Sequence, residues 1–98
     1  NKELNMAKYD VDKLYSQDSV TVREAAYLLG GIPNQNVYEK LESGRLNWVF
    51  GESESGSQIK RVLTKSLYNY ILKMRGELYT RADKYRLPNV VPDNLKED

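Results

Sequence analysis

Hydrophobic residues in the first third of the chain recur at helical spacing and form two groups separated by a short polar stretch. The first group, spaced three or four residues apart, predicts a helical extension over residues 1–18. Its members are Leu4, Ala7, Val11 and Leu14. The second group follows the β-prone residues 19–21, where Thr21 stands three residues before Glu24, as in a capping box. This second helix should end at Gly30-Gly31, because glycine readily adopts the left-handed C-cap conformation.

A further short helix is predicted after Pro33, with Asn34 as its N-cap. Val37 and Leu41 are four residues apart, so both should face inward. Gly44 should end this helix. Two short helices joined by a glycine-containing turn are the outline of a helix-turn-helix.

After Gly44 the sequence changes to an alternation of apolar and polar residues, which is typical of strands. Residues 45–50 and 59–63 predict two strands, and the Gly-, Ser- and Glu-rich residues 51–58 predict a mobile loop between them. Apolar residues then return to helical spacing after Thr64, the expected N-cap of a long C-terminal helix. This helix should reach about Arg86, where Leu87-Pro88 ends it, and residues 88–98 should form a flexible tail.

Composition limits the chemistry that the chain can perform. Its 98 residues correspond to one domain, and they include no cysteine and no histidine. A disulfide framework, a thiolate zinc site, a cysteine nucleophile and the commonest general base are therefore excluded. We expect no catalytic residues, no cofactor and no metal, because the carboxylate pairs at 10/12 and 52/54 lack a third ligand.

No apolar run is long enough to span a bilayer, so we expect no membrane partner and a cytoplasmic protein.

The net charge is only +1, but its distribution is uneven. Between residues 59 and 87, Glu77 and Asp83 are the only acidic side chains. The basic residues of that stretch are Lys60, Arg61, Lys65, Lys73, Arg75, Arg81, Lys84 and Arg86. Such an excess is typical of a surface that binds a polyanion, although a long solvated helix would have the same composition.

Residues 20–72 resemble the small winged helix-turn-helix domains of the excisionase and MerR type. The resemblance rests on Thr21-Val22-Arg23-Glu24-Ala25-Ala26-Tyr27-Leu28-Leu29-Gly30, on Val37-Tyr38 and Leu41, on Ser43-Gly44-Arg45-Leu46, and on Leu63-Thr64 with Leu67, Ile71 and Leu72. It implies an α+β winged helix-turn-helix fold with a two-stranded wing hairpin and a long C-terminal helix. The domain would occupy residues 19–75, and residues 76–87 would continue the helix.

The resemblance also implies binding to double-stranded DNA, with the second helix in the major groove. Base-reading residues would be Asn34, Gln35, Asn36 and Tyr38, since Asn and Gln can pair bidentately with adenine. Phosphate-binding residues would be Lys40, Arg45, Lys60, Arg61 and Lys65. This chain departs from the family at Glu39 and Glu42 on the second helix and at Glu52 and Glu54 in the wing, where basic residues are usual.

The apolar stripe beyond Gly76 lacks an evident partner within the chain, so we expect a homodimer through the same helix of a second copy. The interface residues would be Met74, Leu78, Ala82 and Tyr85. The alternative to this interface is that the helix folds back on the N-terminal segment through Leu4, Val11 and Leu14. Proteins with such domains act in excision, at plasmid transfer origins or in transcription, where a larger recombinase, relaxase or polymerase would be a further partner. The alternative is a protein-interaction module that presents its acidic second helix and wing to a basic protein.

Overall fold

The computed structural model describes residues 9–76 and 84–96, which form an α+β fold. Its helices and strands, in chain order, are α2 (Val11–Tyr15), β1 (Ser19–Thr21), α3 (Val22–Leu28), α4 (Asn34–Glu42), β2 (Trp48–Glu52), β3 (Gln58–Leu63), α5 (Thr64–Gly76) and the 3-10 turn η2 (Asp93–Leu95). The α+β class expected from the sequence is therefore confirmed. No helix in residues 9–76 or 84–96 has the length and apolar character needed to cross a membrane.

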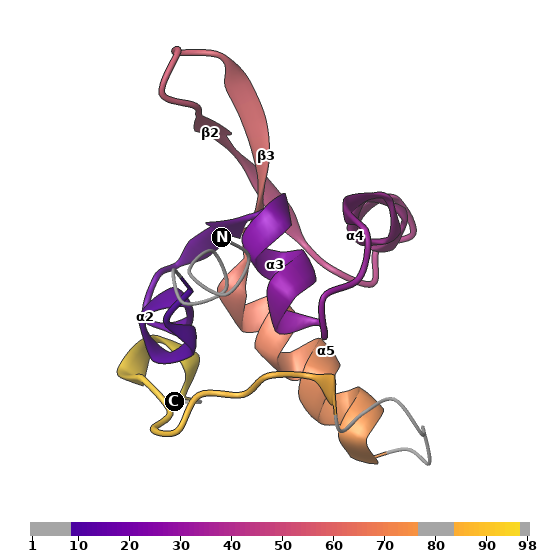
Figure 1. Cartoon of the computed structure of the whole chain (residues 1–98), viewed down its shortest axis with the longest axis vertical. Coiled ribbons are helices and arrows are strands. Elements are labelled where there is room, and N and C mark those ends of the chain that lie inside the picture. The colour runs from indigo at the N-terminus through magenta and orange to yellow at the C-terminus, as the bar shows by residue number, and fades with distance from the viewer. Residues whose placement is uncertain (1–8, 77–83, 97–98) are drawn as a thin grey trace, which may run out of the picture.

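The sheet has three antiparallel strands in the order β1-β3-β2. Val62 on the central strand pairs with Val20 on one side and Trp48 on the other, and both valines are fully buried. The β2–β3 hairpin continues beyond this covered part and projects away from the helices (Figure 1).

Both predicted helix boundaries of α3 are confirmed. The Thr21 Oγ1 accepts a hydrogen bond from the Glu24 backbone N–H at 3.1 Å, and the Glu24 Oε1 accepts one from the Thr21 N–H at 2.9 Å. Gly30 and Gly31 follow with φ angles of +93° and +83°, which allow the chain to leave the helix and enter α4. Buried side chains from α2, the sheet, α3, α4 and α5 form the core, which includes the residues Leu14, Tyr15, Val20, Ala25, Leu28, Leu29, Val37, Leu41, Leu46, Val62, Leu67 and Ile71.

Two predicted N-caps are wrong. Pro33, with an extended backbone, is the N-cap of α4, so Asn34 is the first helical residue. Thr64 is fully buried, and its Oγ1 has no hydrogen-bond partner among the described residues. The Thr64 N–H instead donates to the Asp18 carbonyl at 2.9 Å. Backbone bonding to the segment before β1 therefore replaces side-chain capping at the start of α5.

The hairpin boundaries also differ from those predicted. The backbone N–H groups of Arg45 and Leu46 both donate to the Lys40 carbonyl, so these residues wrap around the end of α4. The first strand therefore begins at Trp48 rather than at Arg45. At the other end, the ladder extends to the pair Glu52 and Gln58, so the connecting loop is shorter than predicted. The Ser53 N–H closes that loop by donating to the Ser57 carbonyl at 2.8 Å.

The predicted continuous helix up to Arg86 is wrong, because residues 85–87 are not helical. The described part of α5 spans Thr64–Gly76. Arg86 lies beside α3 instead: its N–H donates to the Leu28 carbonyl at 2.8 Å, and its guanidinium donates to the Tyr27 carbonyl at 2.6 Å. The guanidinium also lies 4.0 Å from the centre of the Tyr27 ring. Backbone and side-chain partners on α3 thus compete with helical geometry at this position.

The flexible tail predicted over residues 88–98 is wrong for its described part, which ends at Lys96. The Asn89 N–H donates to the Asp12 carboxylate at 2.7 Å, and the Asn94 side-chain amide donates to the Tyr15 carbonyl at 3.0 Å. Leu95 completes the core at 3% exposure. Residues 84–96, which we call the C-terminal strap, therefore cross from α3 to α2 (Figure 1).

The N-terminal extension predicted over residues 1–18 contains a helix only at Val11–Tyr15 among the described residues. Asp10 caps this helix, since its side chain accepts from the Lys13 N–H. Leu4 and Ala7 lie outside the described residues. Tyr15 is buried, and its hydroxyl donates to the Arg86 carbonyl at 2.6 Å. Burial, with a smaller contribution from neighbouring Tyr68, raises the pKa of this hydroxyl well above its usual value.

Candidate nucleic-acid interface

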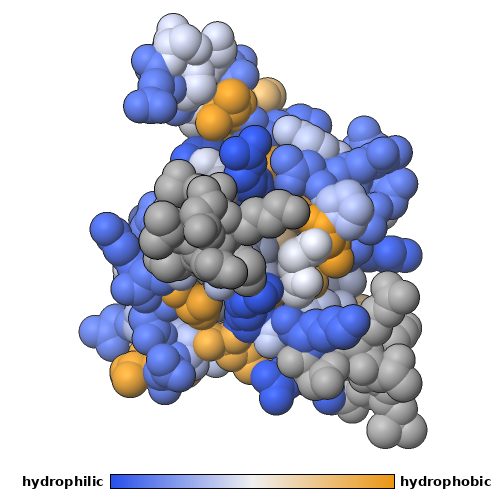
Figure 2. Space-filling model, viewed as in Figure 1, coloured by the Kyte–Doolittle hydropathy of each residue, from blue (hydrophilic) through white to orange (hydrophobic). Residues whose placement is uncertain are grey.

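Helix α4 has one anchored side and one exposed side. Val37 and Leu41 are buried against the core at 0% and 4% exposure, as predicted. Asn34, Gln35 and Tyr38 are exposed, so three of the four predicted base-reading side chains face solvent. Figure 2 shows mostly hydrophilic side chains over this part of the molecule.

The fourth predicted base-reading residue, Asn36, has different surroundings. It is only partly exposed and lines a cleft beneath α4, together with Lys40 from the same helix and Lys84 from the C-terminal strap. Asn36 and Lys40 are four residues apart and therefore share this side of the helix. Asn34, Gln35 and Tyr38 line no part of that cleft.

The two predicted phosphate-binding residues of the hairpin lie on opposite faces, because successive strand residues alternate. Lys60 pairs with Phe50 across the ladder, and its ammonium lies 4.7 Å from the centre of the Trp48 ring. Arg61 binds β1 instead: its guanidinium donates to the Ser19 hydroxyl and the Ser19 carbonyl, each at 2.9 Å. The structure therefore does not bring Lys60 and Arg61 together on one surface.

An exposed aromatic side chain on the hairpin was missed by the sequence reasoning. Phe50 shares a face of the strand with Trp48, because side chains two residues apart point the same way, yet Phe50 is 58% exposed. Its ring meets the Trp48 ring edge-on, with centroids 4.8 Å apart. Phe50 belongs to the β2–β3 ladder, and the projecting hairpin shows hydrophobic surface below a hydrophilic tip (Figure 2). The position of the helices, rather than the strand pattern, determines how much of the hairpin is covered.

Acidic side chains lie close to the predicted reading surface. Glu39 and Glu42 are exposed on α4, and Glu52 and Glu54 are exposed on the hairpin. Within residues 9–76 and 84–96, the one salt bridge joins Lys96 and Asp93, so none of these four carboxylates has a basic partner there. Their charge therefore acts on any ligand that approaches α4 or the hairpin tip.

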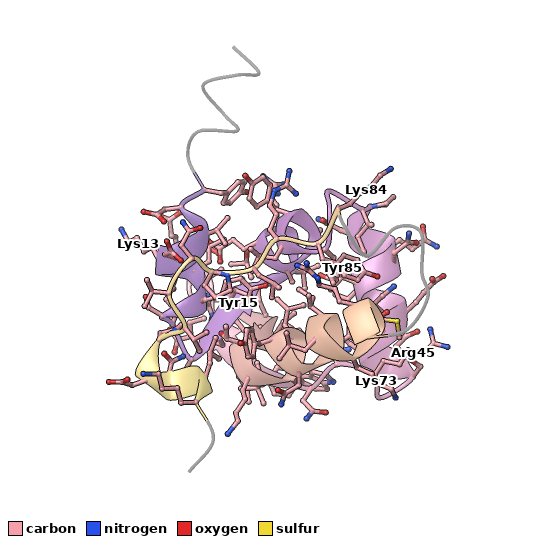
Figure 3. All side chains as sticks on the ribbon, turned by 90° about the horizontal axis from the view of Figure 1, so that it is seen from below. Lys13, Tyr15, Arg45, Lys73, Lys84 and Tyr85 are labelled. Carbon is pink, nitrogen blue, oxygen red and sulfur yellow. The ribbon has the colours of Figure 1, made fainter. Side chains whose placement is uncertain are left out.

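Basic side chains gather on α5 and at the end of α4. Lys65, Lys73 and Arg75 are exposed on α5. Arg45, which follows α4, and Lys73 line a common cleft. Figure 3 shows both residues on the same side of the molecule, beside the described end of α5. The exposed positive charge of α5 thus continues onto the segment that leaves α4.

The two described members of the predicted dimer interface, Met74 and Tyr85, lie on different elements. Met74 is half-buried on α5. Tyr85 lies on the C-terminal strap and packs within its own chain, with its ring centroid 6.5 Å from that of Tyr70. Leu78 and Ala82 lie outside the described residues. Leu72, which the sequence reasoning did not select, is 43% exposed on α5.

The described part of the chain contains no group of three or more His, Cys, Asp or Glu side chains placed to hold a metal ion. In comparisons with protein-family models, curated proteins and solved structures, no match to this chain was found. The candidate interface is therefore defined by the side chains of α4, the hairpin and α5.

Proposed function

We propose that this chain is a winged helix-turn-helix protein that binds double-stranded DNA sequence-specifically and without catalysis. In this proposal α4 is the recognition helix, the β2–β3 hairpin is the wing and α5 is the closing helix. The order β1–α3–α4–β2–β3–α5 supports it, because the family that the sequence resembles arranges its helices and hairpin in this order.

The observation that carries the proposal is the exposed first turn of α4. Asn34 and Gln35 present amide groups to solvent, while Val37 anchors the same helix in the core. An amide side chain can donate to and accept from the major-groove edge of adenine at the same time. A rigid helix that presents such groups at its N-terminal end is suited to base readout.

The biological role that we propose is that of an accessory factor of a mobile element. The protein would mark or bend a DNA site for excision, for plasmid transfer or for transcription. A recombinase, relaxase or polymerase would then assemble at the site. A homodimer would place two copies of α4 on two half-sites, whose spacing would follow from the dimer geometry.

Selection from a random duplex DNA library tests the proposal. The salt concentration should be about 0.15 M, because lower salt strengthens attraction to phosphates of any sequence. We expect an enriched motif, and a repeated or palindromic motif would indicate two bound copies. Absence of enrichment would overturn sequence-specific binding by this chain.

The exposed carboxylates favour one second candidate, a module that binds a basic protein through α4 and the hairpin. Glu39 and Glu42 would then contact the partner, whereas near DNA they would face phosphates of the same charge. The substitution Glu39→Arg separates the two functions. A several-fold tighter complex with duplex DNA would support DNA binding, while no binding by either form would support the protein-interaction module.

A further inference from the structure

A cleft of about 380 Å³ lies between the segment that leaves α4 and the side of α5. Arg45 and Asn47 line one wall, Asn69 and Lys73 line the other, and Tyr70 and Met74 also contribute to the lining. The two walls come from parts of the chain that are at least 19 residues apart. The sequence patterns did not associate them.

The cleft carries an uncompensated positive charge. None of its lining residues is acidic, and neither Arg45 nor Lys73 forms a salt bridge within the described part of the chain. The side-chain amides of Asn47 and Asn69 make no hydrogen bond to any described residue, so both can donate to a ligand. Two cations and two amide donors around one hollow are suited to an oxyanion.

The walls are fixed to each other through the Ser66 hydroxyl. The Ser66 hydroxyl accepts from the Asn47 N–H at 3.1 Å and donates to the Leu63 carbonyl at 2.8 Å. Arg45 is tied to α4 through its N–H, which donates to the Lys40 carbonyl at 2.9 Å. An anion would therefore meet an already assembled set of backbone positions, which lowers the entropic cost of binding.

We propose that this cleft binds a phosphate of the DNA backbone next to the groove that α4 enters, with Lys73 and Asn69 as contacts beyond those assigned from the sequence. The inference rests on the proposed function. Helix α4 has nine residues. Such a helix is about 14 Å long, while the major groove is about 12 Å wide. When the first turn of α4 meets base edges, its far end, followed by Arg45, comes to the level of the phosphates.

The test compares Lys73→Gln with Arg75→Gln in duplex binding, measured by fluorescence anisotropy between about 0.05 and 0.3 M salt. Both substitutions remove one exposed positive charge from α5, but Arg75 does not line the cleft. The probes are a duplex with the selected motif and a scrambled duplex. We expect Lys73→Gln to weaken binding to both duplexes about tenfold, which is typical of losing a charge-assisted contact. The slope of log Kd against log salt should fall by about 1.

Asn69→Asp adds a carboxylate to the same cleft and should weaken duplex binding at least as much as Lys73→Gln. The Kd of Arg75→Gln should stay within about twofold of that of the unsubstituted protein. Circular dichroism and thermal unfolding establish that all three variants fold. Equal losses from Lys73→Gln and Arg75→Gln, or no loss from Lys73→Gln, would overturn the cleft as a phosphate site while leaving the proposed function intact. If the unsubstituted protein binds no duplex, both proposals fail.

Discussion

The Tyr15 hydroxyl donates a 2.6 Å hydrogen bond to the Arg86 carbonyl, across 71 positions of sequence. Tyr15 lies centrally among the side chains (Figure 3). The same Arg86 binds α3 through its N–H and its guanidinium. This contact therefore joins α2, α3 and the C-terminal strap.

Replacing Tyr15 with Phe should lower the free energy of unfolding by about 1–3 kcal/mol, because the Arg86 carbonyl loses a partner in a partly buried position. Urea unfolding followed by circular dichroism measures the loss. Tyr68→Phe is the matched control, since Tyr68 packs edge-on against Tyr15 at 6.0 Å but its hydroxyl makes no hydrogen bond to a described residue. Equal losses in the two variants would contradict a specific role for the Tyr15 hydroxyl.

The raised pKa of Tyr15 predicts a dependence of stability on alkaline pH. In the unfolded chain a tyrosine loses its proton near pH 10, whereas the folded protein retains this proton at higher pH. The unfolded state then binds fewer protons, so stability falls above pH 10 by about 1.4 kcal/mol per unit. The Tyr15→Phe variant has no hydroxyl at this position and does not lose stability in this way. The difference in the free energy of unfolding between the variant and the unsubstituted protein should therefore shrink between pH 9 and about 11. A constant difference over that interval would contradict the prediction.

The C-terminal strap should stabilise the domain through Leu95. Leu95→Ala removes a side chain that is 3% exposed and should cost about 2–4 kcal/mol in the free energy of unfolding. Val90→Ala serves as control because Val90 is 76% exposed on the same strap, and its change should stay within about 0.5 kcal/mol. Denaturant unfolding of both variants gives the comparison. Two equally small effects would mean that the strap does not complete the core.

Gly30 should be intolerant of a side chain for two separate reasons. Its φ of +93° disfavours other residues, and a Cβ there would lie 3.1 Å from the Lys84 Cβ and 3.2 Å from the Lys84 carbonyl oxygen. Gly30→Ala should therefore cost about 2–4 kcal/mol, while Gly56→Ala, at φ +85° with open space around it, should cost about 1 kcal/mol. Thermal unfolding of the two variants isolates the effect of the close approach. A larger loss at Gly56 would contradict it.

Base reading and phosphate binding should respond differently to substitution. Gln35→Ala should cost about 1–3 kcal/mol on the selected motif and relax specificity at one position. Lys60→Ala should weaken binding to all sequences alike, since a phosphate contact carries no sequence information. Competition binding with a panel of single-base variants of the motif measures both effects. An equal loss on every sequence for Gln35→Ala would exclude Gln35 as a base reader.

Much of the domain between residues 19 and 76 was predictable because its signals are local. The capping box of Thr21 and Glu24 involves residues three positions apart, and Gly30-Gly31 ends α3 wherever that helix packs. The spacing of Val37 and Leu41 likewise defines the buried side of α4 and leaves Gln35 on the exposed side. These features depend on backbone conformation and helical periodicity, so the sequence alone determines them.

Only the tertiary structure decided where the C-terminal strap packs and which basic side chains are free to bind a ligand. Apolar spacing continues through Tyr85, yet Arg86 finds its partners on α3, and a periodic pattern carries no information on contacts between residues so far apart. For the same reason the pattern could not show that Arg61 binds Ser19, or that Arg45 and Lys73 line one cleft. The local sequence thus determined the elements and their buried faces, while long-range packing determined the strap and the arrangement of the basic side chains.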